Sequence, residues 1–180
     1  MTEPSHHHDA SQAPSDWITR FAPLVPPDGA VLDLAAGGGR HSRHFLERGH
    51  SLTAVDRTIE GLHDLLNADR AEVLEHDLED GSPLPLPERI FDGVVVTNYL
   101  YRPILPDIVA AVASGGILLY ETFALGNERF GRPRNPDFLL KPGELLDAVA
   151  GHLRVLAYED LIVDTPAPAA VQRICAQREA

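Results

Sequence analysis

The sequence predicts an α/β fold of the doubly wound class, in which helices cover both faces of a mostly parallel sheet. Residues 31–42 pass from an apolar strand through a glycine cluster into the start of a helix. Further apolar strands recur along the chain, and several of them end in an acidic or polar residue. Residues 94–96 are three consecutive valines, as expected for a strand that is covered on both faces.

The segment 31–42, VLDLAAGGGRHS, predicts a nucleotide-type binding loop. Its three glycines, 37–39, allow a tight turn and a close approach of the backbone to a ligand. A helix that begins near Arg40 would direct free N–H groups and the positive end of its dipole toward a phosphate or a carboxylate.

Two kinds of nucleotide are candidate ligands for this loop. The match to the dinucleotide-binding fingerprint is imperfect, because Ser42 stands where a third Gly or Ala is expected. An ionised Asp33, just before the turn, would repel a pyrophosphate and attract an ammonium or sulfonium group. S-adenosylmethionine carries both of these cations and also a carboxylate, so the charge pattern favours it as the ligand.

Residues 33–39 resemble motif I of the class I S-adenosylmethionine-dependent methyltransferases, Asp/Glu-x-Gly-x-Gly-x-Gly. Ala35 replaces the first glycine, which is tolerated unless the backbone there needs a positive φ. The resemblance covers about residues 30–176 and implies a Rossmann-like fold with a seven-stranded, mostly parallel sheet whose last strand is antiparallel. The stretch from the loop near residue 124 through Tyr158-Glu159 also resembles the tellurite-resistance methyltransferase branch.

The strands after the glycine turn supply further cofactor candidates. The strand 51–56 ends in Asp56, which is placed to accept hydrogen bonds from ribose hydroxyls, and Asp77 follows a third strand near residues 73–74. The resemblance implies that Asp77 meets the adenine amino group and that Leu78 supplies a backbone N–H; a solvated acidic loop is the alternative. The predicted cofactor site comprises Asp33, Ala35, Gly37, Gly39, Asp56, Asp77, Leu78 and Asn98.

The fourth and fifth strands, 89–102 and 115–123, are expected to end beside the acceptor, because ligands bind outside the carboxyl ends of parallel strands. A short helix over about 105–113 and a turn at 114–116 would separate them. The residues after the fourth strand do not spell Asp/Asn-Pro-Pro-Tyr, which counts against a methyltransferase of nucleic-acid bases. The side chains that could take or orient a proton are Tyr99, Glu121 and His41.

A connection of roughly twenty residues follows the fifth strand and precedes a helix expected at about 142–150, so it is a candidate lid. Three of its arginines could hold an anionic acceptor, and a solvated basic loop is the alternative. The predicted acceptor residues are Tyr101, Arg129, Arg132 and Arg134.

Two strand-like runs, 152–164 and 169–179, close the chain as a hairpin. The methyltransferase sheet has such a hairpin and the simple dinucleotide-binding fold lacks it. The hairpin therefore favours the methyltransferase interpretation over an NAD(P)-binding oxidoreductase.

Composition indicates one domain over residues 15–180, after a disordered tail over 1–14, because 180 residues that are 44% hydrophobic can form one core. The net charge of −12 disfavours nucleic acid as a partner, because its phosphates are also negatively charged. We expect a cytoplasmic protein, since no apolar run approaches the length of a membrane span and no secretion signal is recognisable. We expect no metal, because the adjacent side chains of His6-His7-His8-Asp9 seldom form a closed site.

The sequence thus predicts in-line transfer of a methyl group from S-adenosylmethionine to a small-molecule acceptor. An anionic acceptor such as a thiolate, a carboxylate or a metalloid oxyanion would need no general base. The alternatives are an NAD(P)-binding oxidoreductase and a non-catalytic nucleotide-binding module. The sequence predicts no particular oligomeric state.

Overall fold

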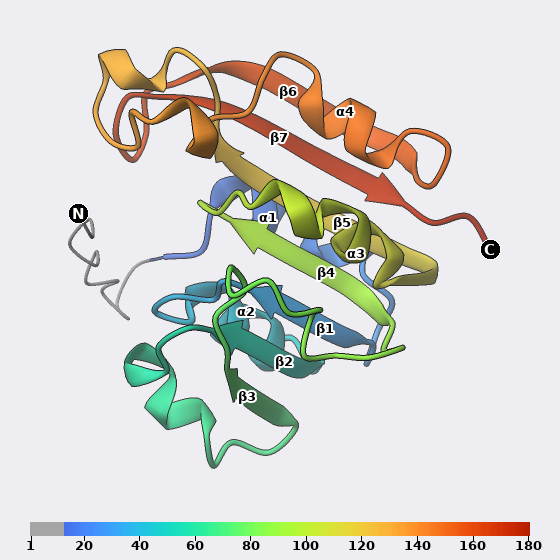
Figure 1. Ribbon diagram of the computed structural model, residues 1–180. Coiled ribbons are helices and arrows are strands. Elements are labelled where there is room, and N and C mark those ends of the chain that lie inside the picture. The colour runs from blue at the N-terminus through green and yellow to red at the C-terminus, as the bar shows by residue number, and fades with distance from the viewer. Residues whose placement is uncertain (1–12) are drawn as a thin grey trace.

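A seven-stranded sheet forms the centre of the molecule in the computed structural model, which describes residues 13–180 (Figure 1). Its strand order is β3-β2-β1-β4-β5-β7-β6. The strands are β1 (Ala30–Leu34), β2 (Ser51–Asp56), β3 (Ala71–Glu75), β4 (Phe91–Thr97), β5 (Val112–Phe123), β6 (Arg154–Val163) and β7 (Ala169–Gln177). Residues 1–12, which include most of the expected tail and the sequence His6-His7-His8-Asp9, lie outside the described residues.

The pairing of the strands confirms the predicted topology. The pairs β1·β2, β1·β4, β2·β3 and β4·β5 are parallel, whereas β7 is antiparallel to both β5 and β6. β4 lies between β1 and β5, and its valines at 94–96 are completely buried. The unbroken valine run therefore marks a strand with packed side chains on both faces, as the sequence predicted.

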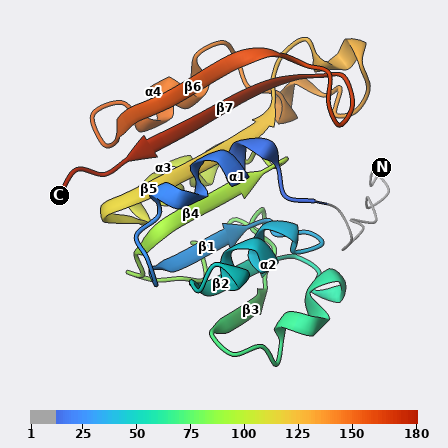
Figure 2. The same ribbon diagram turned by 180° about the vertical axis from the view of Figure 1, so that it is seen from behind.

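The helices divide between the two faces of the sheet. α3 (Leu105–Ala110) and α4 (Glu144–Val149) lie on the face seen in Figure 1, while α1 (Asp16–Phe21) and α2 (Arg40–Glu47) lie on the opposite face, seen in Figure 2. Short 3-10 helices occur in the connections: η1 (Ala22–Leu24), η2 (Glu60–Leu65), η3 (Arg102–Ile104), η4 (Asn127–Arg129) and η5 (Pro136–Phe138). Within residues 13–180, every helix is too short to cross a membrane.

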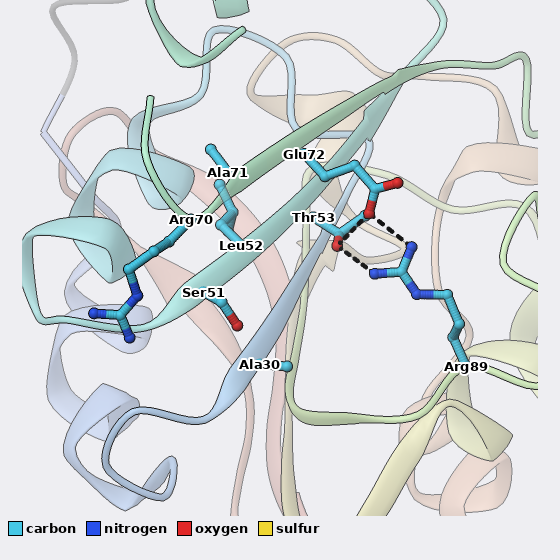
Figure 3. A pocket seen from close by; sticks show the side chains of 8 residues that line it. All are labelled: Ala30, Ser51, Leu52, Thr53, Arg70, Ala71, Glu72 and Arg89. Carbon is cyan, nitrogen blue, oxygen red and sulfur yellow. Dashed lines mark hydrogen bonds and ion pairs between the residues drawn. The ribbon is translucent and has the colours of Figure 1, made fainter. Parts of the chain in front are cut away.

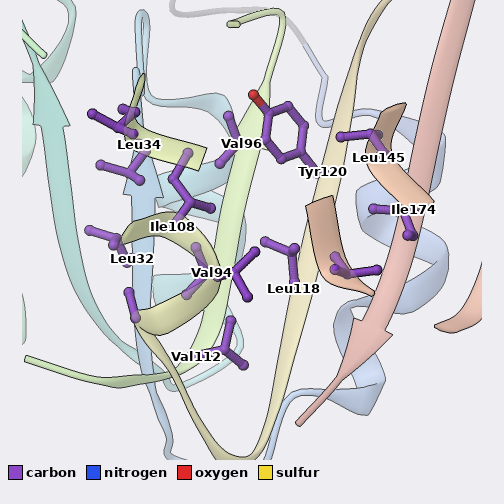
Figure 4. Close-up of a cluster of buried hydrophobic side chains, with 14 of the residues drawn as sticks. Leu32, Leu34, Val94, Val96, Ile108, Val112, Leu118, Tyr120, Leu145 and Ile174 are labelled. Atoms are coloured by element: carbon purple, nitrogen blue, oxygen red, sulfur yellow. The ribbon is translucent and has the colours of Figure 1, made fainter. Parts of the chain in front are cut away.

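Each face of the sheet has its own hydrophobic cluster. The front cluster packs beneath α3 and α4 and includes Leu32, Leu34, Val94, Val96, Leu118 and Tyr120 (Figure 4). The back cluster packs beneath α1 and α2 and includes Trp17, Val31, Phe45, Val95 and Leu119. Burial stabilises each large apolar side chain by about 1.5–3 kcal/mol, so the alternating strand residues fix both helical layers.

The segment between α3 and β5 differs from the prediction. The helix expected to reach about residue 113 ends at Ala110, and β5 begins at Val112, before the expected turn at 114–116. Arg178 explains the difference, since its side chain donates to the carbonyl oxygens of Val109 and Val112. Its backbone also exchanges hydrogen bonds with Gly115 and Gly116, which extends the sheet.

Candidate functional site

The carboxyl ends of the parallel strands meet at one edge of the sheet, on the left in Figure 1. The glycine turn follows β1, Asp56 ends β2, Asp77 follows β3 and Asn98 follows β4. Glu121 lies near the end of β5. The topology therefore places the sequence-predicted cofactor residues along a single edge.

The glycine turn needs left-handed backbone at three positions. The φ angles are +54° at Ala35, +55° at Gly37 and +76° at Gly39. Ala35 thus adopts the conformation for which the family motif uses glycine, which costs about 1–2 kcal/mol in an L-residue with a Cβ. A Cβ at Gly39 would lie 2.6 Å from Cδ2 of Leu62, so a larger residue there would have to displace Leu62 and would also be strained by the positive φ.

Asp56 ties the turn to β2. Its Oδ2 accepts a hydrogen bond from the N–H of Gly37 at 2.8 Å, and its Oδ1 accepts one from the N–H of Thr58 at 3.0 Å. A carboxylate has about four acceptor positions, so both oxygens keep capacity for ribose hydroxyls.

Asp33 differs from the ionised, ligand-facing carboxylate expected from the sequence. Its side chain is only 1% exposed. Oδ2 accepts a hydrogen bond from Oγ of Ser42 at 2.6 Å, and Oδ1 has no partner among the described residues. Burial raises the pKa of Asp33 to about 7, against the lowering effect of the Ser42 hydrogen bond.

The remaining cofactor candidates lie at the ends of β3 and β4. Asp77 is exposed, and its Oδ1 accepts from the N–H of Glu79 at 2.9 Å. The side chain of Leu78 is buried in the front cluster and anchors this loop. Asn98 has a φ of +53°, and its N–H donates to the carbonyl of Glu121 at 2.9 Å, which joins the ends of β4 and β5.

Ser15 connects the N-terminal segment to this edge, a role that the sequence analysis missed. Its N–H donates to Nε2 of His41 at 3.1 Å, and its Oγ donates to Oε1 of Glu121 at 2.6 Å. The same Oγ accepts from the N–H of Trp17 at 3.1 Å and so caps α1. A serine directly before an amphipathic helix is the usual N-cap pattern, so the sequence could have indicated that Ser15 caps α1.

The three proton-transfer candidates are engaged in packing or hydrogen bonds. The imidazole of His41 is 1% exposed; its Nε2 accepts from Ser15, so Nδ1 carries the proton that faces Oγ1 of Thr97 at 3.3 Å. Burial, assisted by the charge of Arg40, lowers the pKa of His41 to about 3. Both carboxylate oxygens of Glu121 also accept hydrogen bonds, from Ser15 and from Arg173.

Tyr99 completes this group. Its hydroxyl is buried and has no hydrogen-bond partner within residues 13–180. Burial raises the pKa of the phenol above its usual range, and the negative charge of Glu79 adds to the shift. Tyr99 is therefore a neutral phenol at physiological pH.

The predicted acceptor residues comprise three exposed arginines and one tyrosine at the front cluster. Arg129 is exposed; its Nε donates to the carbonyl of Gly126 at 3.2 Å, and its guanidinium lies 5.6 Å from the ring centre of Phe130. Arg132 and Arg134 are also exposed, and Tyr101 packs against the front cluster.

Arg102, which the sequence analysis did not single out, holds the loop between β5 and α4. Its guanidinium donates to Oε1 of Glu144 at 2.6 Å and to the carbonyls of Asp137 and Leu139 at 2.7 and 2.9 Å. Leu139 and Leu140 are buried, so this connection is folded against the domain rather than extended.

A cavity of about 240 Å³ lies at the opposite end of the strands, where β1, β2 and β3 begin (Figure 3). Arg89 crosses it, with hydrogen bonds to Glu72 at 2.7 Å and to Thr53 at 2.9 Å. The cavity therefore lies at the far end of the strands from the glycine turn. In the part of the chain that the structure describes, no group of three or more His, Cys, Asp or Glu side chains is arranged to hold a metal ion.

Comparison with known proteins agrees with this geometry. Residues 32–117 match the family described as a methyltransferase domain. No curated protein was found that matches the sequence.

Solved structures share the fold at low sequence identity. TehB from Haemophilus influenzae superposes with a TM-score of 0.70 at 18% identity, covering 90% of this chain and 61% of its own. The 1,6-didemethyltoxoflavin-N1-methyltransferase of Burkholderia thailandensis, solved with S-adenosylhomocysteine, gives 0.66 at 22% identity, covering 91% and 76%. The N-methyltransferase NodS from Bradyrhizobium japonicum gives 0.67 at 15% identity, covering 90% and 94%. The chain thus spans less than two thirds of the length of TehB.

Proposed function

We propose that this chain, a member of the class I S-adenosylmethionine-dependent methyltransferase superfamily, transfers a methyl group from S-adenosylmethionine to a small-molecule acceptor. The match over residues 32–117 supports the class of reaction. A small acceptor is consistent with the structural neighbour that is named for 1,6-didemethyltoxoflavin.

The observation that carries the cofactor assignment is the unpartnered Oδ1 of Asp33 at the start of α2. A buried acceptor atom without a donor is costly, and the ammonium group of a methionine moiety would satisfy it. Free N–H groups at the start of α2 favour the carboxylate of the same moiety. Gly37 and Gly39 have positive φ angles and no Cβ, which lets a ligand approach the backbone of the turn closely.

In this proposal the donor supplies a methyl group that its sulfonium has already activated. Asp56 accepts hydrogen bonds from the ribose hydroxyls, and Asp77 with the backbone of Leu78 binds the adenine edge. Asn98 borders the cofactor at the end of β4, and Tyr99 and Glu121 border the acceptor at the ends of β4 and β5. The task of these residues is alignment and exclusion of water, which in-line displacement needs most.

The state of the proton-transfer candidates narrows the acceptor class. The one basic nitrogen of His41 accepts a hydrogen bond from Ser15, Glu121 is held by Ser15 and ion-paired with Arg173, and Tyr99 stays protonated. We therefore propose an acceptor that arrives as a nucleophile without help from a protein base, such as a thiolate, a carboxylate or a metalloid oxyanion.

Isothermal titration calorimetry with S-adenosylhomocysteine and with NADH tests the cofactor assignment. We expect binding of the first and none of the second. Gly39→Ala should weaken that binding because its Cβ is strained at a φ of +76° and would displace the side chain of Leu62, whereas Gly131→Ala, where a Cβ has open space, should bind normally. Binding of NADH without S-adenosylhomocysteine would refute the methyltransferase assignment in favour of an oxidoreductase.

The acceptor class is tested by release of S-adenosylhomocysteine from S-adenosylmethionine with thiol, carboxylate, metalloid, amine and hydroxyl compounds. We expect turnover with the acceptors that are anionic at the assay pH. Tight cofactor binding with no methylated product from any class would instead support a non-catalytic nucleotide-binding module.

A further inference from the structure

Asp33 is a buried carboxyl group with an incomplete set of hydrogen bonds. It lies on β1 with its side chain toward the start of α2, where Ser42 supplies a hydrogen bond to Oδ2 and nothing in the described chain reaches Oδ1. A buried carboxylate whose hydrogen bonds come from Ser42 alone is unfavourable relative to the neutral acid.

The charged groups that face Asp33 act in opposite directions. Asp56, at the end of β2, favours the protonated form, and Arg40, in the first turn of α2, favours the ionised form. Burial outweighs the hydrogen bond from Ser42, so the pKa of the carboxyl lies near 7 instead of 3.8.

We propose that Asp33 holds a proton when the cofactor is absent and releases it to solvent when the ammonium group of S-adenosylmethionine binds at Oδ1. The O–H bond of the carboxylic acid breaks, its proton passes to the buffer, and the ammonium keeps its own protons and pairs with the new carboxylate. This inference rests on the proposed function. It makes cofactor affinity depend on pH through one residue of the binding site.

The number of protons released on binding measures this linkage. Titration calorimetry with S-adenosylhomocysteine in two buffers of different ionisation enthalpy gives that number directly. A group with a pKa of about 7 that becomes fully ionised on binding should release about 0.9 proton at pH 6, about 0.5 at pH 7 and about 0.1 at pH 8. Affinity should be about tenfold weaker at pH 6 than at pH 8.

A second ligand separates Asp33 from other titrating groups. 5′-Methylthioadenosine carries the adenosyl part without the amino and carboxylate groups. It should bind with no proton release and with the same affinity at pH 6 and pH 8. Release equal to that of S-adenosylhomocysteine would overturn the assignment to Asp33.

Two variants and a control complete the experiment. Asp33→Asn should abolish proton release and the pH dependence of affinity. Ser42→Ala, which removes the hydrogen bond to Oδ2, should raise the pKa and increase release at pH 8; it keeps the test available if Asp33→Asn does not fold. Asp107→Asn, on the exposed surface of α3, should behave as the unmodified protein.

The outcomes separate this inference from the proposed function. Binding of S-adenosylhomocysteine with no proton release at pH 6 overturns the inference alone. So does unchanged release in Asp33→Asn. Failure of S-adenosylhomocysteine to bind at any pH overturns the proposed function and the inference together.

Discussion

Replacing Arg173 with Met should destabilise the protein more than any loss of a surface charge. Arg173 lies on β7, directly opposite Glu121 of β5 on one side and Glu159 of β6 on the other. Its guanidinium donates to Oε2 of Glu121 at 3.1 Å and to Oε2 of Glu159 at 2.7 Å. It also lies 4.9 Å from the ring centre of Trp17, on the helix that Ser15 caps.

The expected size of the effect follows from burial. The side chains of Arg173, Glu121 and Glu159 are 19%, 14% and 28% exposed. Removing one partner of a buried ion pair costs about 3–5 kcal/mol, and partial exposure of this group reduces that figure. The lost cation–π contact adds about 0.5–1 kcal/mol. We therefore expect a loss of about 3 kcal/mol in the free energy of unfolding.

Urea unfolding at pH 7, followed by circular dichroism, measures this loss. Arg154→Met is the matched control, because Arg154 begins β6, is 62% exposed and lies 3.9 Å from Glu179. The control should cost less than about 0.5 kcal/mol. In the Glu121→Gln background the cost of Arg173→Met should fall, since less charge is left unpaired. An Arg173→Met protein as stable as the Arg154→Met control would refute the view that these strand carboxylates depend on Arg173.

Three further predictions concern the glycine turn and the site. Ala35→Gly should stabilise the protein by up to about 1 kcal/mol in urea unfolding, because relief of the left-handed conformation exceeds the added entropy of the unfolded chain; a loss of stability would contradict the assigned φ. Asp56→Ala should weaken S-adenosylhomocysteine binding by roughly 1–3 kcal/mol in calorimetry, and unchanged affinity would mean that the ribose lies elsewhere. The pKa of His41 is about 3 in the folded protein and 6.5 in the unfolded chain. Below pH 6.5 the unfolded chain therefore takes up a proton at His41 that the folded protein does not, and the free energy of unfolding decreases as pH falls toward 3. His41→Gln should therefore remove a slope of up to about 1.4 kcal/mol per pH unit between pH 4.5 and 6.5, and equal slopes in both proteins would contradict the buried neutral imidazole.

The sheet could be predicted from the sequence because its signals are local. The valines of β4 and the apolar residues of β1 are buried by neighbours on both faces, so each strand carries its own hydrophobic run. The end of α3 could not be predicted in the same way. Arg178, whose hydrogen bonds determine where α3 ends, lies 66 residues from Val112 in the sequence, and no local pattern indicates such a contact.

The backbone of the site was predictable for a related reason. Parallel strands place their carboxyl ends at one edge, so Asp56, Asp77 and Asn98 were expected along the same edge once the strands were recognised. The hydrogen bonds that the side chains at that edge make with distant residues could not be predicted. The hydrogen bond from Ser15 to Glu121 joins residues 106 positions apart, and the one from Ser15 to His41 joins residues 26 apart.

The hydrogen bonds at the edge divide its polar residues into two groups. Asp33 and Asp56 lie beside the glycine turn, where Oδ1 of Asp33 has no partner among the described residues and Asp56 accepts from the N–H of Gly37. Glu121 and His41 use their acceptor atoms to hold Ser15 and thereby α1. A base drawn from this second group would have to give up, or share, the hydrogen bond with Ser15 that anchors the N-terminal helix. Rate enhancement by alignment of an acceptor that is already nucleophilic needs no such rearrangement, and a rate of methyl transfer that follows the ionisation of the acceptor alone would be its kinetic signature.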